Sequence, residues 1–244
     1  MPDAPRFAYA AARMQSRYGQ RPAASTWSHL ARIGDFAHLL QSVRATALAP
    51  WVSGFGADTG VHAIEGGLRE AYRTEVAEVA RWVPPDWHAA TAWFAWVPDL
   101  AALAHLRRRR PAHDWMADDP VMRGLGGHQR ADSAGLSDFA TLLDAPDDRG
   151  TVAELWLESW HGRWPRAMRR HRRAAVERVR RRVRGLLGLD GAATDDRAGV
   201  EHDLRRAFRR HTREPAGALA YLALLYIQYR HLRGLLLQPR LFPG

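Results

Sequence analysis

Residues 61–83 have the sequence VHAIEGGLREAYRTEVAEVARWV, in which apolar residues recur every three or four positions. The positions that form this pattern are Ile64, Leu68, Tyr72, Val76, Val79 and Val83. An α-helix has about 3.6 residues per turn, so this spacing places the six side chains on one helical face. The charged residues of the stretch fall largely on the other faces. The stretch therefore predicts a long amphipathic helix that packs against a core through one side.

The same spacing extends over most of the chain and predicts further helices. They are expected at 26–40 with Ser25 as N-cap, 87–108 with a kink or break at Pro98, 137–143, 152–160, 165–187 with Pro165 in its first turn, 200–212, and 216–237 with Pro239 as its stop. Alternating β-branched runs between turn signals are not a feature of this sequence. The predicted fold class is all-α.

A short internal similarity predicts how these helices are organised. Residues 35–40 read DFAHLL and residues 138–143 read DFATLL, with five of six residues identical. Chance is the alternative explanation, because Ala and Leu are abundant. Each copy, however, precedes a Trp-containing irregular stretch, a long amphipathic helix and an aliphatic helix. We expect two related multi-helix lobes that form a funnel-like or repeat-derived domain, divided as 1–24 (N-terminal helix), 25–110 (first lobe), 111–135 (connector) and 136–244 (second lobe).

Composition excludes several kinds of chemistry. The chain has 244 residues and a net charge of +10; all 36 of its basic residues are Arg, and Lys, Asn and Cys are absent. Without Cys there is no thiolate nucleophile, disulfide or thiolate metal site, and without Lys there is no Schiff base or P-loop lysine. A GC-rich coding sequence explains Arg in place of Lys. It does not explain the excess of ten basic residues.

That excess lies in one predicted helix. Residues 163–184 contain eleven Arg and one Glu, a net charge of +10, so the rest of the chain is balanced. Arginines three and four residues apart repel each other by a few tenths of a kcal/mol per pair. We therefore expect an acidic protein or lipid surface against helix 165–187, with Arg169, Arg173, Arg180 and Arg184 as its contacts. A solvated face enriched in Arg by base composition remains the alternative.

Catalytic and metal-binding patterns are weak. The Asp-rich stretches, Asp118-Asp119-Pro120, Asp144-Ala145-Pro146-Asp147-Asp148 and Asp195-Asp196, fit turn and cap roles. The twelve His residues show no metal-ligand spacing, and most of the ten Trp lie on helical stripes that core packing explains. We expect no catalytic residues, cofactor or metal. An all-α enzyme that uses the Asp-rich turns is kept as an alternative.

Three stretches resemble the C-type (in eukaryotes, d-type) central-stalk family of A-type and V-type ATPases. Residues 7–17, FAYAAARMQSR, are similar to that family's opening Tyr/Ala-rich helix with spaced arginines, and a Leu-Leu-containing helix follows them. Residues 63–68, AIEGGL, resemble a helix start with a Glu before a Leu. Residues 215–233 resemble the closing helix, where the family usually carries a Glu and Asn-Leu-Arg, and this chain has Gln228 and His231-Leu232-Arg233.

The resemblance implies an all-α funnel of repeated lobes that links the central stalk to the membrane rotor ring and does no catalysis itself. Its implied partners are the stalk helices and ring of an ion-translocating rotary ATPase. This chain departs from the family in being shorter and in showing two lobes instead of three. No signal peptide is recognisable, so we expect a cytoplasmic protein, peripheral on the inner membrane face through its complex. An Arg-rich all-α nucleic-acid-binding protein is the main alternative.

Overall fold

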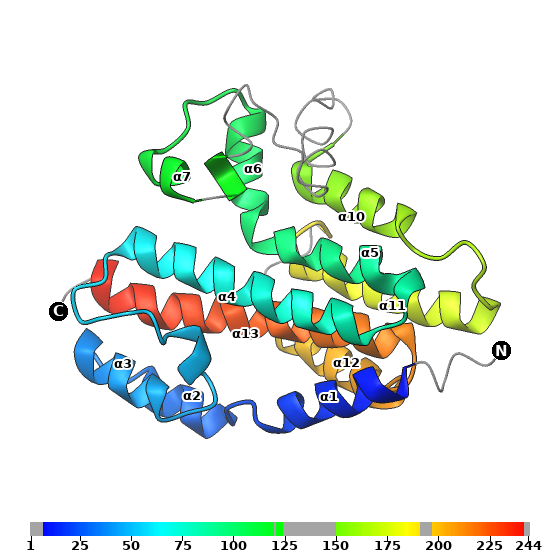
Figure 1. Cartoon of the computed structure of the whole chain (residues 1–244), viewed down its shortest axis with the longest axis horizontal. Coiled ribbons are helices and arrows are strands. Elements are labelled where there is room, and N and C mark those ends of the chain that lie inside the picture. Colours follow the sequence, from blue (N-terminus) through cyan, green and yellow to red (C-terminus); the bar gives the residue numbers. More distant parts are fainter. Residues whose placement is uncertain (1–6, 120, 124–149, 191–196, 242–244) are drawn as a thin grey trace. The chain divides into compact units, whose positions relative to one another are not determined.

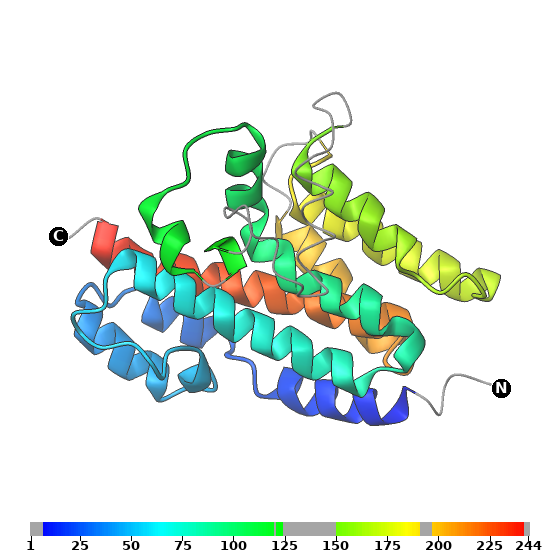
Figure 2. The ribbon, with the colours of Figure 1, turned by 45° about the horizontal axis from the view of Figure 1, so that its top comes forward.

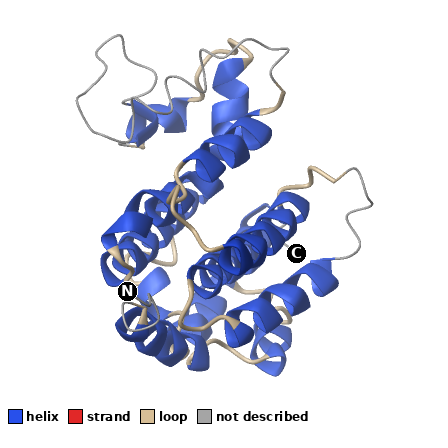
Figure 3. Cartoon of the chain, turned by 90° about the vertical axis from the view of Figure 1, so that its right-hand side faces the viewer, coloured by secondary structure: helices blue, strands red, loops and turns tan. Residues whose placement is uncertain are grey.

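Helices are the only regular elements in the computed structural model, which describes residues 7–119, 121–123, 150–190 and 197–241 (Figure 3). The all-α prediction is confirmed for this part of the chain. The α-helices are α1 (Ala8–Gly19), α2 (Ala24–Leu30), α3 (Phe36–Arg44), α4 (Val61–Trp82), α5 (His88–Ala92), α6 (Leu100–Arg107), α7 (Asp114–Asp118), α10 (Val152–Gly162), α11 (Arg170–Leu186), α12 (Arg197–Arg210) and α13 (Pro215–Leu241). Three short 3-10 helices, η1 (Ala49–Trp51), η2 (Pro85–Trp87) and η3 (Trp93–Asp99), connect some of them.

The chain forms two compact units. Unit 1 combines residues 1–95 with 164–244, and unit 2 spans residues 96–163. The second copy of the internal similarity, at 138–143, lies outside the described residues, as does the helix expected at 137–143. The division into lobes 25–110 and 136–244 therefore stays a prediction.

Helix α13 is the core element of unit 1. Its residues from Pro215 to Leu225 are all buried, and a helix that is apolar all round belongs in an interior. It packs against α1, α3, α4, α5, α11 and α12. Figures 1 and 2 show α4 running alongside it, with α1 on the same unit. Segments from both ends of the sequence thus share one core.

Helix α4 confirms the prediction made from its apolar stripe. Ile64, Leu68, Tyr72, Val76 and Val79 are all fully buried. The helix ends at Trp82 because the next residue precedes Pro84, and a residue before proline favours an extended backbone. The ψ angle of 159° at this residue agrees with that preference.

Two predicted helices are divided in the structure. The stripe over 26–40 is split into α2 and α3, because Asp35 caps a new helix by accepting a hydrogen bond from the His38 backbone N–H at 2.7 Å. Ser25 is not the N-cap of α2; that position is Ala23, and Ser25 lies inside the helix. The helix expected over 87–108 is broken into η2, α5, η3 and α6. Pro98 lies in the 3-10 segment, as its missing N–H allows.

Two predicted helix ends are wrong. Helix α11 begins at Arg170, not at Pro165, and four arginines between 166 and 172 would crowd the positive end of the longer helix. Helix α13 continues through Pro239 to Leu241. Proline there removes only one backbone hydrogen bond in the last turn. Arg240 fixes this end, since its guanidinium donates to the Ala57 carbonyl and lies over the Phe36 ring at 4.1 Å.

Unit 2 has its own small core. Helix α10 begins with a capping box, in which Thr151 and Glu154 satisfy each other's backbone N–H. Trp156 and Trp160 of α10 are fully buried and stack with ring centroids 5.7 Å apart. The Arg107 guanidinium of α6 donates to the Gly150 carbonyl at 2.5 Å. In neither unit do the described residues include a helix with the length and apolarity needed to cross a membrane.

Candidate functional site

The basic helix predicted to contact a partner is α11, in unit 1. Its apolar seam is confirmed in part: Ala175, Val176, Val179 and Val183 are buried, whereas Met168 lies before the helix begins. The seam fixes which arginines point away from the core. Every Arg whose side chain is exposed therefore lies on the remaining faces of the helix.

The structure separates the four predicted contact arginines from one another. Arg169 is the exposed N-cap residue of α11, and Arg173 donates to the backbone carbonyl of Arg166 at 3.3 Å. Arg180 lies 3.6 Å from the Glu177 carboxylate. Arg184 donates to the Asp190 carboxylate at 2.8 Å and to the carbonyl that precedes it. Only Arg184 of the four lines a cavity.

That cavity is a groove of about 620 Å³ between α11 and α12, which we call the arginine groove. Its lining includes six arginines from the two helices: Arg178, Arg181, Arg182, Arg184, Arg206 and Arg210. Its apolar lining consists of Ala175, Val179, Leu204 and Ala207, and its carboxylates are Asp190 and Asp203. The groove therefore combines an apolar floor with basic walls.

Sequence reasoning missed the α12 side of this groove. The run RRAFRR at 205–210 places Arg206 and Arg210 one helical turn apart, on the same face of α12. This second basic cluster was a signal available in the sequence. Its alignment with α11 was not available, because it depends on how the two helices pack.

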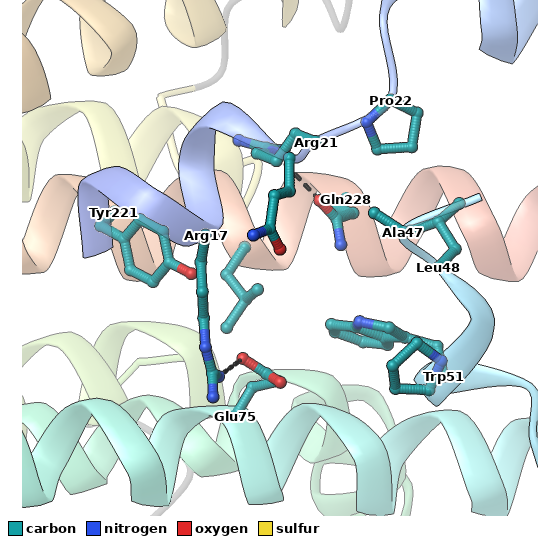
Figure 4. A pocket seen from close by; sticks show the side chains of 12 residues that line it. Arg17, Arg21, Pro22, Ala47, Leu48, Trp51, Glu75, Tyr221 and Gln228 are labelled. Atoms are coloured by element: carbon teal, nitrogen blue, oxygen red, sulfur yellow. Dashed lines mark hydrogen bonds and ion pairs between the residues drawn. The ribbon is translucent and has the colours of Figure 1, made fainter. Parts of the chain in front are cut away.

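A second, smaller pocket of about 200 Å³ lies elsewhere in unit 1, among α1, α4, η1 and α13 (Figure 4). Arg17 of α1 pairs with Glu75 of α4 across it. Arg21 donates to the Gln228 side-chain oxygen at 2.9 Å and to the Leu224 carbonyl at 2.9 Å. The pocket is therefore crossed by polar contacts that join the N-terminal helix to α4 and α13.

Burial controls the electrostatics of this pocket. Desolvation lowers the pKa of Arg21, an effect that Glu201 partly opposes. Burial raises the pKa of Tyr221 to about 12, and the nearby Glu75 carboxylate acts in the same direction. Arg17 is exposed to the extent of 31% and pairs with two carboxylates, those of Glu75 and Glu78. The pocket thus serves as a polar joint between helices, with its cations already held by internal acceptors.

The three helices that contain the family-like stretches are joined by side-chain contacts. Arg13 and Arg17 of α1 lie over the Trp82 ring of α4, 5.2 and 4.7 Å from its centroid. Glu65, near the start of α4, pairs with Arg233 of α13. Helices that are far apart in sequence are therefore connected through residues that carry the likeness.

The Asp-rich stretches show no catalytic arrangement in the described residues. Asp119 is buried and its carboxylate accepts hydrogen bonds from the backbone N–H of Val121 at 2.9 Å and of Met122 at 3.2 Å, which is the cap role expected of it. Asp144, Asp147, Asp148, Asp195 and Asp196 lie outside the described residues. Where the chain is described, no three or more His, Asp or Glu side chains are grouped so as to hold a metal ion.

No protein-family model, curated protein or solved structure matches this chain. Its function is therefore inferred from its own contacts and surfaces.

Proposed function

We propose that this chain is a non-catalytic adaptor of an A/V-type rotary ATPase, which links the central stalk to the membrane rotor ring. The observation that carries the proposal is the packing of three distant helices in unit 1. Helices α1, α4 and α13 contain the stretches that resemble the family, and α1 and α4 pack on α13 and on each other. Helices that resembled the family by chance would have no reason to share one core.

Individual contacts support the proposal. Arg233 closes the triplet His231-Leu232-Arg233, which stands where the family carries Asn-Leu-Arg, and it pairs with Glu65. Gln228 stands where the family usually carries a Glu, and its side-chain oxygen accepts from Arg21. An amide oxygen thus makes the hydrogen bond that a carboxylate would make at this position. These contacts give a structural role to residues of the motif.

A copurification experiment tests the proposal. The chain carries an affinity tag in its native host, membranes are solubilised in mild detergent, and the proteins retained with the chain are identified by mass spectrometry. We expect stalk and ring proteins of a rotary ATPase among them. A matched control is the variant Glu65→Arg/Arg233→Glu, which reverses the pair between α4 and α13, keeps the chain's net charge and should retain the same partners.

Two results would overturn the proposal. One is recovery of the folded chain without rotary-ATPase proteins from membranes that contain an assembled rotary ATPase. The other is a gene neighbourhood that encodes no such proteins. The expected location, the cytoplasmic face of the membrane, is checked by whether the chain sediments with membranes only while the rotor is present.

An Arg-rich nucleic-acid-binding protein is the second candidate function. The arginine groove is the observation that favours it, since six arginines converge there. Titration of the chain with single-stranded DNA, beside titration with a helical peptide, separates a nucleic-acid partner from a protein partner.

A further inference from the structure

The arginine groove has two basic walls with an apolar floor between them. One wall is formed by Arg178, Arg181 and Arg182 of α11, and the other by Arg206 and Arg210 of α12. All five of these side chains are exposed. Between the walls, Val179 and Leu204 are buried to 1% and 0% exposure, yet they contribute to the lining. A ligand that fits this groove must be acidic on two sides and apolar in the middle.

The charges in the groove are only partly compensated. Asp203 pairs with Arg182 at 2.5 Å, and Asp190 pairs with Arg184 at 2.8 Å. Arg178, Arg181, Arg206 and Arg210 have no carboxylate partner among the described residues. Six arginines against two aspartates leave a net charge of +4 in the lining. Four arginines therefore remain available for a ligand that brings negative charge.

We propose that the arginine groove binds an acidic amphipathic helix of a partner protein. An amphipathic helix inserts its apolar face into a groove through residues spaced three and four apart. The apolar floor would accept that face, while Glu or Asp on its two flanks would pair with the arginines of α11 and α12. Guanidinium groups suit such pairs because they bind a carboxylate through two parallel hydrogen bonds.

Other classes of partner fit the groove less well. Proteins that bind single-stranded nucleic acid stack the bases on aromatic side chains, and the only ring in the lining is that of His211. Asp190 and Asp203 would also repel a phosphate backbone. A flat membrane surface reaches protruding side chains but not a recessed floor. A helical protein segment uses both the floor and the walls.

The inference goes beyond the proposed function and does not depend on it. The groove lies between α11 and α12, whereas the contacts that support the adaptor role join α1, α4 and α13. A rotary-ATPase protein is one partner that could supply the helix. If copurification fails, the groove can still bind the helix, so the two failures are distinguishable.

A binding experiment on the full chain tests the inference. The probe is a fluorescein-labelled synthetic helix of about five turns, with Leu at i, i+3, i+4 and i+7 and Glu on both flanks. Binding is measured by fluorescence anisotropy. The test variant is Arg181→Glu/Arg210→Glu, which reverses one charge on each wall. The matched control is Arg170→Glu/Arg209→Glu, which reverses one exposed charge on each of the same helices outside the groove.

We expect the groove variant to weaken binding at least about tenfold, because two attractive contacts become repulsive. The control variant should weaken it less than about threefold, because exposed charges outside the contact are screened by salt. If the groove variant does not fold, as judged by circular dichroism, Arg178→Gln/Arg206→Gln takes its place. A probe with every Leu replaced by Ser should bind at least about tenfold more weakly, because it cannot use the floor.

Several results would overturn the inference. Equal loss in the groove and control variants would show that only diffuse positive charge is involved. Equal binding of the Ser-substituted probe would show that the floor takes no part. Parallel titrations use single-stranded DNA and vesicles of phosphatidylcholine with and without phosphatidylserine. Binding of either ligand that is lost in the groove variant, with no binding of the helical probe, would identify nucleic acid or lipid as the partner instead.

Discussion

Tyr221 lies in α13 beside the small polar pocket, and only 3% of it is exposed. Burial raises its pKa to about 12; Glu75 adds to the effect, and Arg17 and Arg21 oppose it. The folded pKa is thus above the ordinary value of about 10. The neutral phenol contributes its full stabilisation below pH 10, and this contribution is lost as the pH rises from 10 through 12.

We therefore predict a loss of stability in alkaline solution that one substitution removes. Between pH 10 and pH 12 the free energy of unfolding should fall by up to about 2–3 kcal/mol more in the original chain than in Tyr221→Phe. The measurement is urea unfolding followed by circular dichroism at several pH values. Tyr9→Phe is the control, because Tyr9 is 61% exposed and its substitution should leave the pH dependence unchanged. Identical pH profiles for the chain and Tyr221→Phe would contradict the prediction.

At the scale of elements, α13 contains two glycines with opposite surroundings. A Cβ at Gly217 would collide with the backbone carbonyl of His211, in the turn that ends α12. A Cβ at Gly234 would meet nothing within 4 Å. The turn between α12 and α13 can approach the helix closely only because residue 217 has no side chain.

The same substitution should therefore have opposite effects at the two positions. We predict that Gly217→Ala lowers the free energy of unfolding by about 1–3 kcal/mol, because backbone atoms must shift. Gly234→Ala should raise it by about 0.5–1 kcal/mol, because alanine favours a helix. Urea unfolding of both variants in one buffer provides the measurement. A stabilising Gly217→Ala would show that α12 and α13 are not packed this closely.

At the scale of the whole molecule, the core of unit 1 is shared between the two ends of the chain. Helix α13 packs against α1, α3, α4 and α5, all of which precede residue 96. The exposed run Arg108–Arg110 lies between these segments in the sequence, and Arg109 has a positive φ of 53°. The peptide bond after Arg109 is therefore a position at which the chain could be divided.

We predict that residues 1–109 and 110–244, produced together as two chains, assemble into one complex. Burial of α13 against the first fragment provides the driving force. The measurement is copurification through a tag on one fragment, followed by size-exclusion chromatography. As a control, Leu224→Asp in the second fragment places a charge at a fully buried position and should abolish assembly. Two fragments that fold and elute separately would refute the shared core.

Local pattern was sufficient for some elements and insufficient for others. Helix α4 could be predicted because its stripe of apolar residues is unbroken and Pro84 marks its end. The split between α2 and α3 was missed because Ile33 keeps the helical spacing across the turn that Asp35 caps. The start of α11 was missed because Pro165 fits a first turn, although the arginines that follow it disfavour one. Such boundaries depend on a few competing interactions at each helix end.

The all-α class and the location of the whole net charge in residues 163–184 could be determined from the sequence without a structure. Both follow from local information, namely the helical spacing of apolar residues and the count of ionised side chains. That α12 lies beside α11 and supplies the second wall of the arginine groove was decided by the tertiary structure. So was the division between arginines that face the groove and arginines that pair elsewhere. The physical reason is that helix formation depends on neighbours within a turn, whereas the pairing of helices depends on how their apolar faces are buried together.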